Sequence, residues 1–246
     1  MKNNIQKKSM LRFSPTAWAK LLFMRDMTNN EVGGFGITKA NDLLFVTDFA
    51  LVKQKVTSIS VSFDDEAISG FFEDQVAAGR KPQEFARHWI HTHPGSSPEP
   101  SCTDEKTFDR VFGPCDWAVM AIIAQDGNSY ARLRFNTGPG GEVKIPVYVD
   151  YDCEFAGSDL DLWIQQYKAN VFVDEILKEK SEKLIFDEKL LADLPPLKND
   201  RSFSLLTSDD LIAEVDKMDP IERQLFIDEL AVRSDFWDQE NEVLYG

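Results

Sequence analysis

Apolar residues along the first 150 positions alternate between helical and strand spacing. Helical spacing follows Ser14 and Pro15, a cap residue and a favoured first helical residue, and it returns after the acidic start at Asp64. A third, shorter helical segment begins at Asp104 and is closed by Gly113 and Pro114. The pattern therefore predicts helices over residues 15–27, 64–79 and 104–112.

Between these helices lie runs rich in Val, Ile, Phe and Thr, the residues that favour strands. They predict strands over residues 31–37, 43–52, 56–63, 85–92, 117–124, 130–135 and 143–149. The last three are separated by turn-forming residues rich in Gly, Asp, Asn and Pro. Because strands and helices interleave, we expect residues 1–153 to form one α/β domain.

A different pattern begins at Ser158. Leu160, Trp163, Tyr167, Val171 and Ile176 follow a helical stripe over a charged remainder, and further helices are predicted to open at Ser208 and Asp219. We therefore expect residues 154–246 to form a helical extension. Its apolar stripes are explained either by packing onto the domain or by recruitment of a partner, and packing is the better supported of the two.

The net charge of −15 belongs almost entirely to this extension. Residues 1–153 carry 19 acidic and 17 basic side chains, whereas residues 154–246 carry 23 and 10. Such a surface repels nucleic acid and anionic lipid, so neither is an expected partner. The acidity suits either a solvated helical surface or a basic protein partner in a complex.

Cysteine usage and the lack of long apolar runs indicate the compartment. The three cysteines form no zinc-finger spacing and an odd number, which argues against a disulfide framework. Neither a secretory signal nor a run of about 18 apolar residues is found. We expect a cytoplasmic protein without a membrane span.

All three histidines of the chain lie within six residues, at His88, His91 and His93. Side chains alternate faces along a strand, so His91 and His93 point to the same side and can offer two imidazole nitrogens to one metal ion. A His-x-His pair alone is a weak signal. His88 is out of register with this pair and is expected to face away or to support a ligand from outside.

Asp104 follows His93 by eleven residues, after a proline-rich loop that cannot form regular strand pairing. A carboxylate there could complete a set of three ligands, which leaves the fourth position of a tetrahedral zinc ion for water. The alternative is that Ser101 and Asp104 form only a helix cap, without a metal. Spacing alone favours the cap.

The segments His91-Thr92-His93-Pro94 and Ser101-Cys102-Thr103-Asp104 resemble the JAMM (MPN-plus) signature of zinc metalloproteases, His-x-His-Pro followed after six residues by Ser-x-x-Asp. That family also has a glutamate on an early strand about sixty residues upstream, where Glu31 precedes small residues. The resemblance covers about residues 10 to 150. It implies a cytidine-deaminase-like α/β fold in which a mixed β-sheet is flanked by helices.

The resemblance also implies roles for individual residues. His91, His93 and Asp104 would bind one Zn²⁺ with a catalytic water, Glu31 would act as general base and acid, and Ser101 would donate to the oxyanion. Zinc lowers the pKa of its water to about 7, and a carboxylate beside it can take up and return the proton. The reaction would be hydrolysis of an amide or isopeptide bond.

Family members act on ubiquitin-like proteins or on small sulfur carriers that end in Gly-Gly. A narrow site suits such a thin tail, and we expect residues 64–82 and the loop 113–116 to contact the substrate. Three alternatives stay open: a non-catalytic scaffold, a metallopeptidase for another peptide, and an adaptor whose main task lies in the acidic extension. Cys102 is assigned no role.

Overall fold

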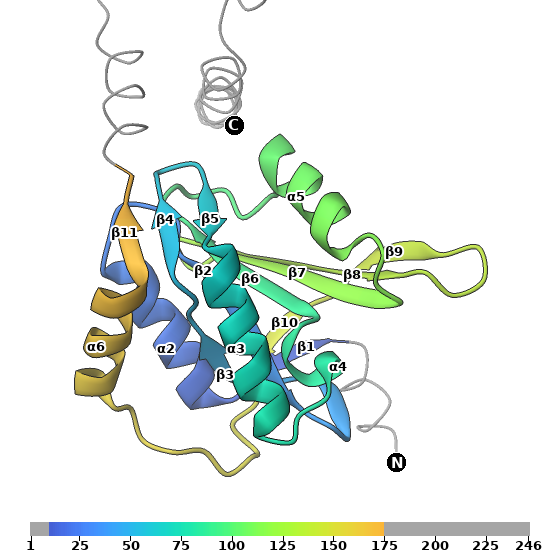
Figure 1. Cartoon of the computed structure of the whole chain (residues 1–246), viewed down its shortest axis with the longest axis horizontal. Coiled ribbons are helices and arrows are strands. Elements are labelled where there is room, and N and C mark those ends of the chain that lie inside the picture. The colour runs from blue at the N-terminus through green and yellow to red at the C-terminus, as the bar shows by residue number, and fades with distance from the viewer. Residues whose placement is uncertain (1–9, 175–246) are drawn as a thin grey trace, which may run out of the picture. The chain divides into compact units, whose positions relative to one another are not determined.

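The computed structural model describes residues 10–174. Within this range an eight-stranded mixed sheet has the order β10-β1-β3-β2-β6-β7-β8-β9 (Figure 1). Its strands are β1 (Leu11–Phe13), β2 (Gly33–Lys39), β3 (Asp42–Ala50), β6 (His88–His93), β7 (Trp117–Ala124), β8 (Ser129–Phe135), β9 (Gly141–Lys144) and β10 (Val147–Val149). Strand β1 runs parallel to β3 and β10, and β6 parallel to β7; the other pairs are antiparallel.

A second sheet has three strands in the order β11-β4-β5. These are β11 (Val171–Val173), β4 (Gln54–Val56) and β5 (Val61–Phe63). The helices of the described range are α2 (Pro15–Asp26), α3 (Asp65–Ala77), α4 (Pro82–Phe85), α5 (Cys102–Phe112) and α6 (Leu160–Asn170). The α/β class expected from the sequence, with a mixed sheet flanked by helices, is confirmed.

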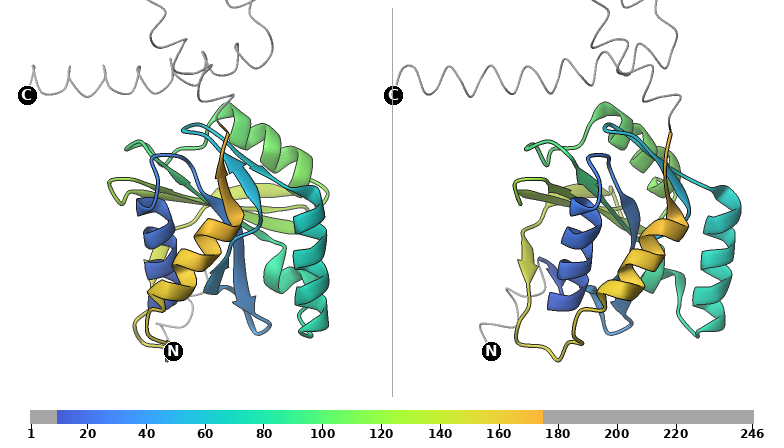
Figure 2. Two further views of the ribbon diagram at one scale, coloured as in Figure 1. Left: turned by 60° about the vertical axis from the view of Figure 1, so that its left-hand side comes forward. Right: turned by 90° about the vertical axis from the view of Figure 1, so that its left-hand side faces the viewer.

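The large sheet separates two hydrophobic cores. One core joins α2 and α6 to the face that carries Ile90, and the other joins α3 and α5 to the face that carries Trp89. Figure 2 shows α2 and α6 together on one side and α3 on the other. Because neighbouring residues of β6 point to opposite faces, His91 and His93 share the face of Trp89, and His88 shares that of Ile90.

Two predicted helix starts are confirmed by their caps, whereas the helix predicted from Asp104 begins two residues earlier, at Cys102, behind the cap residue Ser101. Ser14 accepts a hydrogen bond from the amide of Ala17, and Asp64 accepts one from Ala67. These side chains satisfy amides that the first helical turn leaves without partners. Pro15 occupies the first turn of α2, where its missing N–H costs nothing.

Two predicted strands are each divided. The strand predicted over 56–63 is interrupted by a turn, in which Thr57 and Ser60 bond through both their main chains and their hydroxyls. The strand predicted over 143–149 is broken at Pro146, which has no N–H for a sheet. Its two parts, β9 and β10, lie at opposite ends of the strand order.

Three further boundaries differ from the prediction. The strand predicted from Glu31 begins at Gly33, and the one predicted from Phe85 begins at His88 because Phe85 still belongs to α4. The helix predicted after Ser158 ends at Asn170, and Val171 begins β11, which pairs with β4. The helices predicted at Ser208 and Asp219 lie outside the described residues.

The described residues up to Val173 belong to one compact unit. This unit includes α6 and β11, which follow the boundary predicted at Cys153. Trp163 of α6 is buried in the core beside α2, and its indole lies 5.7 Å from the ring of Phe23. None of the helices in residues 10–174 has the length and apolar character needed to span a bilayer.

Candidate metal centre

Strand β6 presents two imidazoles to one side of the sheet. His91 is fully buried and His93 is partly exposed, and their ring centroids lie 5.2 Å apart. The strand is held on both sides, since His91 is in register with Gly33 of β2 and Ile122 of β7. This double pairing fixes the direction in which both rings project.

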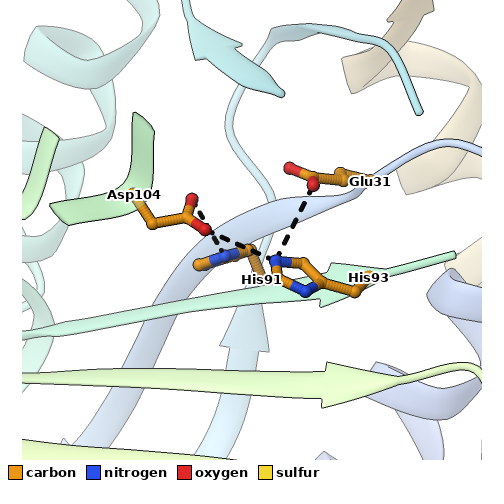
Figure 3. Close-up of side chains that lie close together, drawn as sticks. All are labelled: Glu31, His91, His93 and Asp104. Carbon is orange, nitrogen blue, oxygen red and sulfur yellow. Dashed lines mark ion pairs between the residues drawn. The ribbon is translucent and has the colours of Figure 1, made fainter. Parts of the chain in front are cut away.

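The loop after β6 returns the chain so that the first turn of α5 faces these rings. Oδ1 of Asp104 lies 3.2 Å from Nε2 of His91, and Oδ2 lies 3.4 Å from Nε2 of His93 (Figure 3). Asp104 is 5% exposed, so the carboxylate has left bulk water to meet the two imidazoles. The three predicted ligands therefore converge.

Glu31 reaches the same place from the other side. It lies in the connection between α2 and β2, is 4% exposed, and points its carboxylate toward His93, with Oε1 3.7 Å from Nε2. Figure 3 shows Glu31 and Asp104 approaching the imidazoles from different elements. One ligand-type atom from each of the four residues lies within 4.8 Å of all the others, so this group can hold a metal ion.

The spacing of these atoms fits a tetrahedral ion. Two donors that each lie about 2.0–2.1 Å from zinc, at a tetrahedral angle, are about 3.3 Å apart. Each oxygen of Asp104 lies close to that distance from one imidazole, Oδ1 at 3.2 Å from His91 and Oδ2 at 3.4 Å from His93. Among the described residues, Nε2 of His91 and of His93 has no partner in hydrogen-bond geometry, although both atoms are buried. Such converging, unsatisfied nitrogens are what a metal ligand set requires.

The two imidazoles are oriented by different contacts. Nδ1 of His93 lies 3.0 Å from the main-chain oxygen of Ser97, so it donates there and leaves a lone pair on Nε2. His91 instead stacks on the indole of Trp89, with centroids 4.5 Å apart and planes 29° apart. Both arrangements leave Nε2 directed at the centre.

Electrostatics favour a cation at this point. Although burial raises the pKa of Asp104, the two imidazoles outweigh it and hold that pKa far below its usual range. Burial lowers the pKa of His91 and would lower that of His93, but Asp104 and Glu31 reverse the effect and raise the pKa of His93. Two buried carboxylates beside imidazoles thus attract positive charge, which a divalent ion can supply.

Ser101 caps α5 and also touches the ligand carboxylate. Its hydroxyl and its amide donate to Oδ2 of Asp104 at 2.9 and 2.8 Å, and its Oγ accepts from the amide of Asp104 at 3.2 Å. The cap proposed as an alternative to a metal site is therefore present, and it coexists with the convergence of ligands. Cys102 is exposed in the same turn.

Helix α5 is also held at its outer side. Arg132 of β8 pairs with Glu105 at 2.6 Å and with Glu142 of β9 at 3.2 Å, and its guanidinium lies 5.5 Å from the centroid of Phe108. Since Glu105 directly follows Asp104, this ion pair fixes the first turn of the helix against the sheet.

Three residues that support the site were not found from the sequence. Trp89 stacks on His91, although a tryptophan on a buried strand by itself indicates only a core residue. Thr92, between the two ligand histidines, accepts a hydrogen bond from the amide of Val32 at 3.0 Å, and Gln54 of β4 binds the main chain of Gly33. Thr92 and Gln54 act on segments far away in the sequence, so no local pattern signals their roles.

No family model matches the chain, and a search of curated proteins finds no match.

Proposed function

We propose that this protein is a JAMM-type zinc metalloprotease that hydrolyses an amide or isopeptide bond at the Gly-Gly end of a ubiquitin-like protein. One observation carries the proposal: Glu31, His91, His93 and Asp104 converge, with one ligand-type atom of each within 4.8 Å of all the others. Three protein ligands with a carboxylate alongside are typical of a catalytic zinc site. A structural zinc site instead has four protein ligands and no position open to water.

His91, His93 and Asp104 would hold the ion. When bound, zinc would supply an acidified water and polarise the scissile carbonyl. Glu31, whose Oε1 lies 3.7 Å from Nε2 of His93, would accept a proton from that water and later deliver it to the departing amine. The hydroxyl of Ser101 now donates to Asp104, and by turning away from that carboxylate it would donate instead to the carbonyl oxygen as charge develops there, an interaction worth about 3 kcal/mol in comparable sites.

The burial of the candidate metal centre favours a substrate whose segment at the metal is thin. Glu31, His91 and Asp104 are at most 5% exposed, and only His93 reaches solvent appreciably. A Gly-Gly tail can pass along such a wall without side-chain clashes. Residues 64–82 and the loop 113–116 are proposed to contact the folded part of the substrate, and residues 154–246 to bind a partner in a complex.

The test compares a panel of ubiquitin-like fusions as substrates, with and without a chelator. Wild-type protein is expected to carry one zinc per chain and to cleave at least one fusion. Glu31→Gln should retain the zinc and lose at least 100-fold in kcat, since a general base contributes about 10²–10⁴. Glu154→Gln, a change at an exposed glutamate outside the site, is the matched control.

Folded protein that binds no zinc and cleaves no fusion would favour the scaffold. Cleavage that survives Glu31→Gln at the wild-type rate would remove Glu31 from the mechanism. Zinc-dependent cleavage of short peptides, with every ubiquitin-like fusion left intact, would assign the substrate to another class.

A further inference from the structure

Gln54 has a buried side-chain amide that makes the hydrogen bonds a neighbouring strand would make. It is 1% exposed, and its Nε2 donates to the carbonyl oxygens of Gly33 and Val52 at 2.8 and 2.9 Å. Its Oε1 accepts from the amide of Gly33 at 2.8 Å. The side chain thus satisfies both main-chain groups of Gly33, as a neighbouring strand would.

The strand that would otherwise do this has already ended. Strand β3 pairs with β2 only as far as the pair Phe35 and Ala50, so Gly33 lies beyond the end of β3. On its other side Gly33 is paired with His91 of β6. Gln54 therefore completes the sheet at the one position of β2 that is in register with a ligand histidine.

Glu31 lies two residues before Gly33, and the connection between them is also held. The amide of Glu31 donates to the carbonyl oxygen of Thr57 at 2.8 Å, and the amide of Val32 donates to the hydroxyl of Thr92 at 3.0 Å. Thr57 directly follows β4, the strand that carries Gln54. One short strand thus anchors both ends of the segment from Glu31 to Gly33.

Strand β4 is itself supported from the C-terminal side. Gln54 is in register with Val171 of β11, a strand that follows α6 in the chain. The main chain of Gln54 is therefore fixed by β11 while its side chain fixes Gly33. A continuous path of pairing connects residues 171–173 to the position of Glu31.

We infer that Gln54 is a positioning residue that, through the main chain of Gly33, holds the Glu31 carboxylate beside His93. The consequence for catalysis rests on the proposed function, whereas the consequence for the position of Glu31 does not. Loss of the amide leaves both main-chain groups of Gly33 buried without partners, so the segment must move to find new ones.

The test replaces Gln54 by Met, which has a similar length and no hydrogen-bonding amide. Thr38→Val is the matched control, because the buried Thr38 lies on the same strand and donates to the carbonyl oxygen of Glu84, away from the centre. We expect Gln54→Met to lower kcat at least tenfold with KM within twofold and one zinc retained. Thr38→Val should leave kcat within twofold.

A crystal structure of Gln54→Met supplies a readout that needs no activity. The Glu31 carboxylate is expected to lie more than 1 Å from its present position, with the histidines unmoved. Gln54→Asn, which keeps an amide but is one methylene shorter and so cannot hold both main-chain groups of Gly33, should give a smaller loss, and it carries the test if the Met variant does not fold.

An unmoved Glu31 in the variant structure would overturn the inference. An equal loss of kcat in Gln54→Met and Thr38→Val would do the same, since it would reflect general damage to β2. If wild-type protein neither binds zinc nor hydrolyses any fusion, the proposed function fails, and the position of Glu31 in the variant crystal still decides the role of Gln54.

Discussion

The indole of Trp89 lies flat against the imidazole of His91, and this contact replaces a hydrogen bond. Among residues 10–174, neither ring nitrogen of His91 has a partner in hydrogen-bond geometry, whereas His93 is fixed by the carbonyl oxygen of Ser97. The orientation of His91 therefore depends on packing between Trp89 and the ring it covers.

Trp89→Leu is expected to weaken zinc binding by about tenfold, because support around a ligand histidine typically contributes 10–100-fold in affinity. Trp89→Phe keeps an aromatic face and should lose less. Competition with a chromophoric chelator measures both constants. Trp117→Leu is the control, since Trp117 contacts His88 on the opposite face. Equal weakening by Trp89→Leu and Trp117→Leu would contradict a specific role for the stack.

His88 provides a prediction about pH. It is fully buried, and burial lowers its pKa to about 4, with only a weak opposing effect of the Leu43 main chain, which falls short of hydrogen-bond geometry. In the unfolded chain the same imidazole takes up its proton near pH 6.5. Between these values the unfolded state binds more protons, so the free energy of unfolding falls as the pH decreases from about 6.5 to about 4.

The contribution of His88 over that window is about 3 kcal/mol. Leu has no titrating group, so in zinc-free protein the curve for His88→Leu should decline less with acidification than that for the wild type. Urea unfolding at a series of pH values measures the free energy of unfolding of both proteins. The titration of His91 affects both proteins equally, so it cancels in the difference between them. Curves that stay parallel from pH 7 to pH 4 would show that His88 does not titrate in this way.

The segment that follows Cys153 is expected to be part of the folded domain. A chain that ends at Cys153 loses Trp163 from the core and removes β11 from β4. Loss of one buried tryptophan costs about 3–5 kcal/mol, so this chain should unfold at a markedly lower temperature, whereas a chain that ends at Val173 should keep most of its stability.

Calorimetry of both truncations decides the point. Equal melting temperatures would mean that α6 and β11 contribute nothing to the fold. A chain ending at Val173 that melts like the shorter one would show that later residues are required.

The sequence predicted features that local chemistry determines. The starts of α2 and α3 follow from the cap residues Ser14 and Asp64, and the span of β7 from its apolar run. The shared face of His91 and His93 follows from strand alternation. Spacing marked Asp104 as a candidate ligand but by itself favoured a helix cap, so the family resemblance was needed for Asp104 as a ligand and for Glu31.

The errors arose where strand or helix composition does not decide the structure. Residues 56–63 have strand composition throughout, yet the bonds between Thr57 and Ser60 turn the chain there. Residues 171–173 continue a helical stripe, but β4 offers them an open edge. Gln54 takes the place of a missing strand, and only the register of β2 against β3 and β6 shows that one is missing.

We propose that two imidazoles and one carboxylate hold a single zinc ion. Crystals of the zinc-loaded protein, measured at energies on both sides of the zinc absorption edge, test it directly. We expect one anomalous peak per chain, about 2.0–2.1 Å from Nε2 of His91, Nε2 of His93 and an oxygen of Asp104. Folded protein with no peak among these residues, or with its only peak elsewhere, would contradict it.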